Sequence, residues 1–310
     1  MPSKLPHVLS EKLVNFYLDK LKNNPGLHDK IEFDIVYSCF TFNLPKRIQE
    51  LKSNGFTLEE IDELTESLRL LTKNIIENEG PWDKDLKKIE TLEDKRKIII
   101  NSDLDLVSKI YWLVEDCKRY GTLPFAGLAR VGFIAVEFLK SLEAVGILTQ
   151  SEVDCFMNSL HTISNTYSHD QKNLSPEDFI HKYGHLRPGT YDITAPRYDE
   201  HPEQYIRQEK SLSEETKKSH FVLNLTQISH IKELLRQYEI DLDVLGLFDC
   251  IKKGIEAREY AKFVFTRNLS ESMRLFAQLS EQHGLTREDS SYISFETIKE
   301  LYSSSKDIKT

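Results

Sequence analysis

The residues best suited to chemistry lie close together in one run, 183–193, with the sequence YGHLRPGTYDI. Two glycines and a proline interrupt helical backbone there, so the polar side chains fan out from a turn. From such a turn Arg187 can bind a phosphate or a carboxylate through two parallel hydrogen bonds, and His185 can move a proton or orient an acceptor hydroxyl. The alternative is a tight loop between helices in which Arg187 and Asp192 pair with each other. The motif itself names no reaction, so both interpretations stand.

Further cations occur where they can reach a phosphate, although each also has a structural explanation. Arg197 and Tyr198 follow the run closely and add a second guanidinium and a phenol, as the end of a solvated loop also would. Arg258 and Lys262 stand one helical turn apart and place two cations on one helix face, which is typical of solvated helices too. Arg130 follows small residues that favour close helix packing. In each case the structural explanation is the more economical one.

The elements that position these residues are helices, because most of the chain has amphipathic periodicity. Apolar residues recur at three- and four-residue steps from Leu58 to Leu71, where Thr57 and Glu60 are spaced as a capping box. The same pattern predicts helices over 104–120, 125–145, 151–166 and, after 223, three or four more. Only 31–37 alternates apolar and polar residues, which indicates a short strand, or at most a strand pair near 31–42. The predicted fold is therefore mainly α, with bundle-like helical domains.

A polar segment gives the chain its best candidate boundary. At 310 residues the chain is long enough for one large core or two ordinary ones. Residues 196–219 contain almost no aliphatic side chains, which is typical of a loop or linker. We therefore expect a helical acceptor-side domain over 1–210, which includes the turn, and a C-terminal helical subdomain over 211–310.

Composition and charge argue against several classes of protein. The formal charge of −9 and the pI near 5.7 disfavour a dedicated nucleic-acid binder. The four cysteines form no CxxC pair and the ten histidines show no ligand spacing, so we expect no metal site. The N-terminus lacks the apolar core of a signal peptide, and no uncharged apolar run approaches the ~20 residues that span a bilayer. We expect a cytoplasmic protein without a membrane partner.

The run 182–200, with the sequence KYGHLRPGTYDITAPRYDE, resembles a signature in the central region of phosphoenolpyruvate-utilising enzymes. The branch it resembles is that of phosphoenolpyruvate synthase-like and pyruvate phosphate dikinase-like proteins. Three other stretches are similar to the same region: HDKIEFDIVYSCFTFN at 28–43, FAGLARVGFIAVEFLKSLEAVGIL at 125–148 and AREYAKFVFTRNLSESM at 257–273. The resemblance thus covers nearly the whole chain, and the motif at 183–193 is its most specific part.

The resemblance implies one part of a three-part phosphotransferase. In such enzymes an ATP-grasp domain takes phosphate from ATP, and a swivelling domain carries it on a phosphohistidine. This chain is similar to the helical part between them, which holds the acceptor in rifampin phosphotransferases. No stretch resembles an ATP-grasp domain or a TxSH-type phosphohistidine loop, so ATP and Mg are expected only on those two domains. The expected partners are those domains, in cis or in trans, and a small-molecule acceptor, and the isolated chain is expected to be inactive.

Within this resemblance, side-chain chemistry assigns hypothetical roles to the turn and its neighbours. Arg187 would neutralise the moving phosphoryl group, and His185 or Asp192 would take the proton of the acceptor. The remaining candidates are expected to bind substrate or phosphate: Arg197, Tyr198, Tyr191, Arg130, Arg258 and Lys262. Two alternatives stay open, a non-catalytic helical scaffold or interaction domain and an independent binder of a phosphorylated small molecule.

Overall fold

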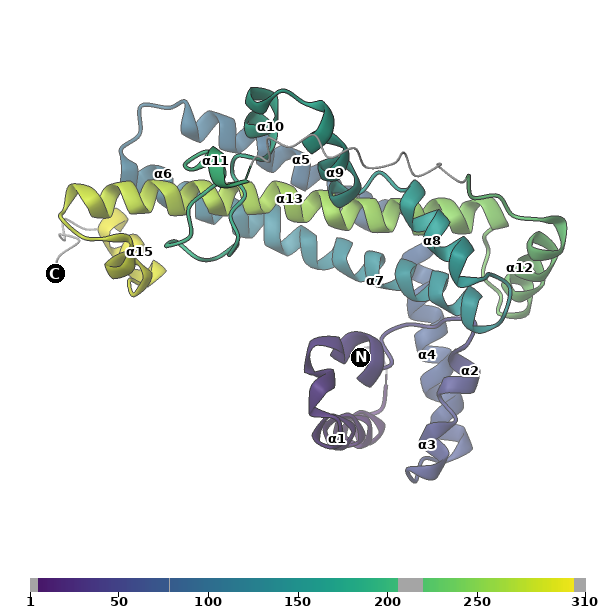
Figure 1. Ribbon diagram of the computed structural model, residues 1–310. Coiled ribbons are helices and arrows are strands. Elements are labelled where there is room, and N and C mark those ends of the chain that lie inside the picture. The colour runs from purple at the N-terminus through teal and green to yellow at the C-terminus, as the bar shows by residue number, and fades with distance from the viewer. Residues whose placement is uncertain (1–4, 78, 206–219, 304–310) are drawn as a thin grey trace. The chain divides into compact units, whose positions relative to one another are not determined.

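The computed structural model describes residues 5–77, 79–205 and 220–303, and these residues are mainly helical, as predicted (Figure 1). No strand occurs among them. The α-helices are α1 (His7–Asn23), α2 (Leu44–Arg47), α3 (Glu50–Ser53), α4 (Leu58–Ile76), α5 (Glu79–Ile100), α6 (Leu106–Asp116), α7 (Leu123–Ala144), α8 (Gln150–Ser159), α9 (Ile163–Asn173), α10 (Pro176–Tyr183), α11 (Pro202–Tyr205), α12 (Leu225–Gln237), α13 (Val244–Gln282), α14 (Arg287–Ser291) and α15 (Phe295–Ser303).

The chain forms two compact units, each assembled from three separate stretches of sequence. Unit 1 comprises Met1–Pro81, Arg130–Leu160 and Lys218–Ile255, and unit 2 comprises Trp82–Ala129, His161–Lys217 and Glu256–Thr310. The long helices α7 and α13 contribute residues to both units. The boundary expected between residues 210 and 211 lies outside the described residues.

Helix α4 shows how closely local sequence determines a helix start in this protein. Thr57 Oγ1 accepts a hydrogen bond from the Glu60 N–H (3.2 Å), and Glu60 Oε2 accepts one from the Thr57 N–H (2.8 Å). The predicted capping box is therefore confirmed. Downstream, Ile61, Leu64 and Leu68 are buried at the predicted three- and four-residue steps.

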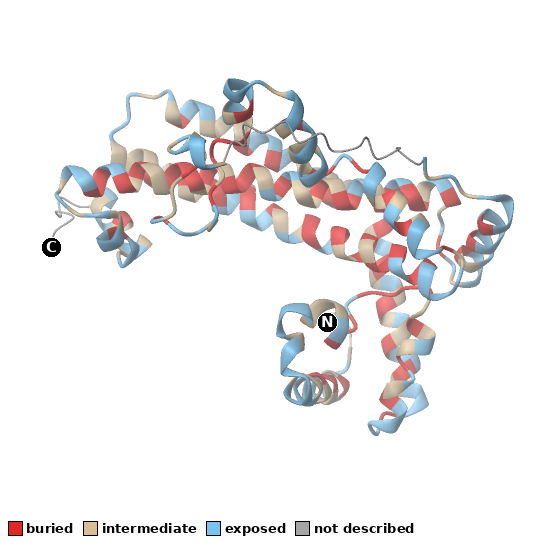
Figure 2. Ribbon diagram, in the orientation of Figure 1, coloured by how far each residue is buried: buried red, intermediate tan, exposed pale blue. Residues whose placement is uncertain are grey.

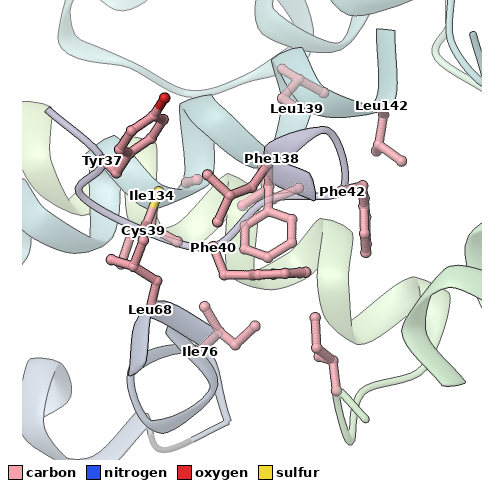
Figure 3. Close-up of a cluster of buried hydrophobic side chains, with 14 of the residues drawn as sticks. Tyr37, Cys39, Phe40, Phe42, Leu68, Ile76, Ile134, Phe138, Leu139 and Leu142 are labelled. Atoms are coloured by element: carbon pink, nitrogen blue, oxygen red, sulfur yellow. The ribbon is translucent and has the colours of Figure 1, made fainter. Parts of the chain in front are cut away.

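The core of unit 1 contains an extended segment packed among helices. Tyr37, Cys39, Phe40 and Phe42 are buried in one cluster with side chains of α4 and α7 (Figure 3). Phe42 meets Phe138 of α7 edge-on, with 5.3 Å between ring centroids. Buried residues, red in Figure 2, recur along the helices that enclose this segment.

The strand predicted near 31–42 is wrong, and the reason lies in the backbone donors of this segment. Ile31–Ile35 forms a π-helical turn, and an irregular stretch follows it. The N–H groups of that stretch find side-chain acceptors on helices: Tyr37 donates to Tyr17 Oη (3.3 Å) and Phe40 to Thr72 Oγ1 (2.8 Å). The two-residue alternation reflects real burial, but the extended chain packs against helices instead of pairing with another strand.

One continuous helical stretch, Leu106–Ala144, is long and apolar enough to cross a bilayer by length and composition. The mean hydropathy of its most apolar window is 1.5, and 56% of that window is buried inside the protein. Core helices pass the same test, because a helix that is apolar on most sides is buried either in protein or in lipid. The stretch therefore gives only weak support for a membrane location.

Candidate functional site

The turn at 183–193 is part of a loop whose two ends are held together by main-chain hydrogen bonds. Helix α10 ends at Tyr183 with Gly184 as its C-cap, and the Asp199 N–H donates to the Gly184 oxygen (3.1 Å). One residue further in, the Tyr198 N–H donates to the Leu186 oxygen (2.9 Å). A Cβ at Gly184 would lie 2.9 Å from the Asp199 Cβ, so this close approach requires glycine. The loop at 184–199 runs beside α13 (Figure 1). Ser270 of α13 joins the two: its main-chain oxygen accepts a hydrogen bond from Arg187 Nη2, and its hydroxyl donates to the main-chain oxygen of His185.

Arg187 fastens this loop with its guanidinium. The side chain is buried, and Nη1 donates to the main-chain oxygens of Asp192 (3.0 Å) and Ala195 (3.2 Å). Nη2 donates to the main-chain oxygen and to Oγ of Ser270, both at 3.3 Å. Of the three guanidinium nitrogens of Arg187, Nε alone finds no hydrogen-bond partner in the described parts of the chain. The fork expected to bind phosphate is thus occupied by protein acceptors, and the contact with Asp192 involves its main-chain oxygen instead of its carboxylate.

His185 is a neutral imidazole in this site. Its side chain is 6% exposed, and its ring packs edge-on to Phe263 with 4.7 Å between centroids. Burial lowers the pKa of His185 to about 2, and the positive charges of Arg267 and Arg197 add to the effect. Its Nε2 has no hydrogen-bond partner in the part of the chain that the structure describes. The ring can therefore exchange a hydrogen bond with a ligand, but it carries no charge at neutral pH.

Arg197 is committed to two carboxylates. Its Nε and Nη2 donate to the two oxygens of Asp199 (2.9 and 2.5 Å), and its Nη1 donates to Glu271 Oε2 (2.6 Å). Glu271 also pairs with Arg274, at 2.6 Å. With its donors directed at buried or half-buried carboxylates, Arg197 acts in the structure as a tie between the loop and α13.

The other turn residues with predicted roles lie at the loop surface. Asp192 is exposed, and its Oδ1 accepts hydrogen bonds from the hydroxyl (2.6 Å) and the N–H (2.8 Å) of Thr194. These bonds hold the pKa of the Asp192 carboxyl below its usual range, which makes it a weak base. Tyr191 is 70% exposed, and Tyr198 stacks on Tyr205 with 4.2 Å between ring centroids.

The three cations predicted from helix segments differ in their surroundings. Arg258 pairs with Glu259 (3.0 Å). Lys262, on the same helix, is exposed, and its ammonium pairs with no carboxylate among the described residues. Arg130 is exposed and belongs to unit 1, whereas the turn and the other two cations belong to unit 2.

A pocket of about 200 Å³ lies between the turn and α13, and we call it the motif pocket. It brings together three of the predicted residues: His185, Arg187 and Lys262. The other lining residues are Ile163, Leu186, Thr190, Glu259, Phe263, Thr266 and Ser270. Two cations and one carboxylate give this lining a formal charge of +1. Of the residues predicted to act, Asp192, Arg197, Tyr191, Tyr198, Arg130 and Arg258 do not line it.

Sequence reasoning missed Glu259, Thr266 and Ser270. A signal was available, because residues 259, 262, 266 and 270 recur at three- and four-residue steps and so share one helix face. No group of side chains suited to hold a metal ion occurs within residues 5–77, 79–205 and 220–303.

No family model, curated protein or solved structure matches this chain. The case for function therefore depends on the geometry of the motif pocket and on the motif that forms one side of it.

Proposed function

We propose that the chain is the acceptor-side region of a phosphoenolpyruvate synthase-like phosphotransferase. In this proposal the motif pocket binds a small carboxylate, which receives a phosphoryl group from a phosphohistidine carried on another domain. ATP and Mg belong to further domains that act in cis or in trans, in the cytoplasm. The observation that carries the proposal is the pocket itself: the motif at 183–193 supplies one side of a small cationic pocket.

The size of the motif pocket supports a ligand with about as many heavy atoms as pyruvate. An engineered protein cavity of about 150 Å³ binds benzene, whereas pockets for drug-sized ligands measure about 300–1,000 Å³. At about 200 Å³ the motif pocket is close to the lower of these sizes. A three-carbon acid fits this volume, and a nucleotide does not.

The charge of the motif pocket supports an anion with a single carboxylate. Lys262 is the cation that remains available, because the described carboxylates leave its ammonium unpaired. Arg187 still has its Nε–H, and His185 contributes one neutral hydrogen-bonding nitrogen. An ammonium pairing with a carboxylate in a partly buried pocket forms a charge-assisted hydrogen bond, which is about twice as strong as a neutral one.

These contacts give roles that differ from those assigned on side-chain chemistry alone. Lys262 binds the carboxylate of the acceptor, and the neutral ring of His185 orients it. Glu259 is the carboxylate that lines the pocket, so it, instead of Asp192, takes a proton from the methyl carbon of pyruvate. The enolate oxygen then forms the new bond to phosphorus as the P–N bond of the phosphohistidine breaks. Arg187 keeps the turn in place through its main-chain contacts.

The test is binding of pyruvate to this chain, followed by amide chemical shifts in NMR spectra. We expect shifts at residues of the turn and of the adjoining face of α13. Lys262→Met should weaken binding about two- to five-fold, because Lys262 is exposed and an exposed ion pair contributes up to about 1 kcal/mol. Lys84→Met is the matched control, since Lys84 is an exposed lysine of unit 2 that does not line the pocket. Equal affinities of the two variants would refute the proposed site.

A second candidate function is a scaffold without catalysis, and the commitment of two buried arginines supports it. Arg187 directs four hydrogen bonds at main-chain oxygens and at Ser270, and Arg197 pairs with Asp199 and Glu271. Both arginines then serve to hold the loop against α13. A chain that loses stability in Arg187→Ala and binds neither pyruvate nor inorganic phosphate would fit this scaffold. Preferential binding of inorganic phosphate would instead indicate a binder of phosphorylated small molecules.

A further inference from the structure

Unit 1 contains a second and larger pocket, of about 610 Å³, which we call the polar pocket. We propose that it binds a polyhydroxylated ring molecule without negative charge, such as a sugar, a cyclitol or an amino sugar. Its volume lies within the range of about 300–1,000 Å³ that is usual for small-molecule sites. It is lined by Lys20, Phe33, Asp34, Ile35, Tyr37, Asn43, Arg47, Glu50, Glu137, Lys140, Glu143, Ala144 and Gln150.

The backbone around the polar pocket contains a π-helical turn, Ile31–Ile35. Such turns are rare and occur frequently at functional sites. Three residues of this turn, Phe33, Asp34 and Ile35, line the pocket, and the last turns of α7 line it as well.

One part of the pocket lining is a hydrogen-bonded group around Tyr37. The Tyr37 hydroxyl donates to Glu50 Oε1 (2.5 Å), and Lys20 pairs with the same carboxylate (2.7 Å). Figure 3 shows the Tyr37 hydroxyl pointing away from Cys39 and Phe40, at the edge of the core cluster. Burial, together with the neighbouring Glu50, raises the pKa of Tyr37, so its hydroxyl stays protonated. Tyr37 and Glu50 are therefore held in place before any ligand arrives.

A second group fixes the part of the lining formed by α7. Arg47 pairs with Glu137 (3.2 Å) and donates to the main-chain oxygen of Phe33 (3.0 Å). Lys140 pairs with the same carboxylate (3.4 Å), and its ammonium lies 4.8 Å from the centre of the Phe33 ring. Glu137 is 8% exposed, whereas the side chains of Arg47 and Lys140 reach the solvent, so the buried carboxylate is the fixed centre of this group. Pre-organised polar groups of this kind reduce the entropy lost when a ligand binds.

The balance of charge argues against an anionic ligand. Lys20, Arg47 and Lys140 are all paired with Glu50 or Glu137. Two further lining carboxylates, Asp34 and Glu143, are exposed and pair with no cation in the described parts of the chain. Counting all lining residues, three cations and four carboxylates give a formal charge of −1, and the unpaired charges are both negative. A phosphate or carboxylate would meet repulsion here, whereas an ammonium group would be attracted.

The chemistry of the lining suits hydroxyl groups. A hydroxyl both donates and accepts, and the lining offers carboxylate acceptors, ammonium donors and the amides of Asn43 and Gln150, which do both. The ring of Phe33, with Ile35 and Ala144, adds apolar surface against which the C–H face of a sugar ring can pack. The inference does not depend on the proposed phosphotransfer, because every lining residue belongs to unit 1 and the motif pocket belongs to unit 2.

The experiment uses three probes that share one ring and differ in charge: glucosamine, glucose and glucose 6-phosphate. Amide chemical shifts of the full chain are followed during titration with each probe. We expect millimolar binding of glucosamine and glucose, with shifts at residues 33–50 and 137–150, and glucosamine binding about two- to five-fold more tightly, as one exposed ion pair allows. We expect no such shifts with glucose 6-phosphate. Absence of shifts with all three probes, or tightest binding of the phosphate, would overturn the inference.

Two variants locate the binding. Ala144→Trp should fill the pocket and abolish the shifts, whereas Val145→Trp, at a neighbouring exposed position that does not line the pocket, should leave them unchanged. Glu143→Lys changes only an exposed side chain and should remove the preference for glucosamine over glucose while both still bind. Unchanged binding in Ala144→Trp, or a retained preference in Glu143→Lys, would also overturn the inference.

Discussion

Replacement of Arg187 by alanine tests whether the conspicuous arginine of the motif holds the turn to α13. The guanidinium is 7% exposed and donates four hydrogen bonds, at 3.0–3.3 Å, to the main-chain oxygens of Asp192 and Ala195 and to Ser270. The substitution removes all four and leaves their acceptors without this donor. We expect the turn to lose its attachment to the helix and unit 2 to lose stability.

The magnitude follows from burial and from the number of bonds. Each hydrogen bond to a charged group contributes about 1.5–3 kcal/mol, but burial of the guanidinium offsets part of that sum, as its lowered pKa indicates. The substitution leaves neutral main-chain and hydroxyl acceptors without their donor, and each buried acceptor left unsatisfied costs about 1–3 kcal/mol. With several acceptors affected, we expect a total loss of about 3–5 kcal/mol. With a urea dependence of about 2 kcal/mol per M, the unfolding midpoint should fall by about 2 M.

The assay is urea unfolding followed by tryptophan fluorescence. Both tryptophans of the chain, Trp82 and Trp112, belong to unit 2, so the signal reports on the unit that contains the turn. Lys262→Met is the comparison variant, because an exposed side chain without an ion pair should change stability by no more than about 0.5 kcal/mol. A midpoint for Arg187→Ala within about 0.3 M of the wild type, which corresponds to about 0.6 kcal/mol, would refute the anchoring role.

Other predictions concern acid stability and the packing of the turn. Burial raises the pKa of Glu200, but hydrogen bonds from Arg287 outweigh it and lower the pKa from 4.5 to about 2. Because the pKa is lowered on folding, this carboxylate stabilises the fold above pH 4.5, and its contribution is lost as the pH falls from 4.5 through about 2. The stability difference between wild type and Glu200→Gln, measured by urea titration, should therefore be constant near neutral pH and shrink across that window; a constant difference would contradict the assignment. Gly184→Ala places a Cβ against the main-chain oxygen of Ile180 and should cost about 1–3 kcal/mol in thermal unfolding. Gly26→Ala, where a Cβ meets nothing within 4 Å, should have little effect, and equal losses in the two variants would show that close packing at Gly184 is not the cause.

Local features of the fold could be predicted from the sequence because they depend on neighbouring residues. The capping box at Thr57 and Glu60 forms as its spacing predicts. The helix expected over 125–145 corresponds to α7, which ends at Ala144, and Gly146 follows with the positive φ of 77° that favours glycine after a helix. In both cases the hydrogen bonds involved are only a few residues apart.

Features that depend on distant partners could not be predicted in this way. Residues 31–37 alternate as a strand does. The N–H groups of Tyr37 and Phe40, however, donate to side chains on helices, those of Tyr17 and Thr72. The turn was predicted as a cluster of polar side chains, yet the sequence does not say whether Arg187 faces a ligand or the main-chain oxygens of its own loop. Likewise the two units share α7 and α13, an arrangement that no single polar segment can indicate.

The central claim is that the motif pocket serves phosphoryl transfer to a small carboxylate. The most direct measurement combines this chain with an ATP-grasp domain and a phosphohistidine domain, in cis or in trans, and follows phosphoenolpyruvate formation from ATP, Mg and pyruvate by phosphorus NMR. The account predicts formation that requires this chain, that drops about two- to five-fold in Lys262→Met and that is unchanged in Lys84→Met. Formation that proceeds equally without this chain, or equally with Lys262→Met, would contradict it.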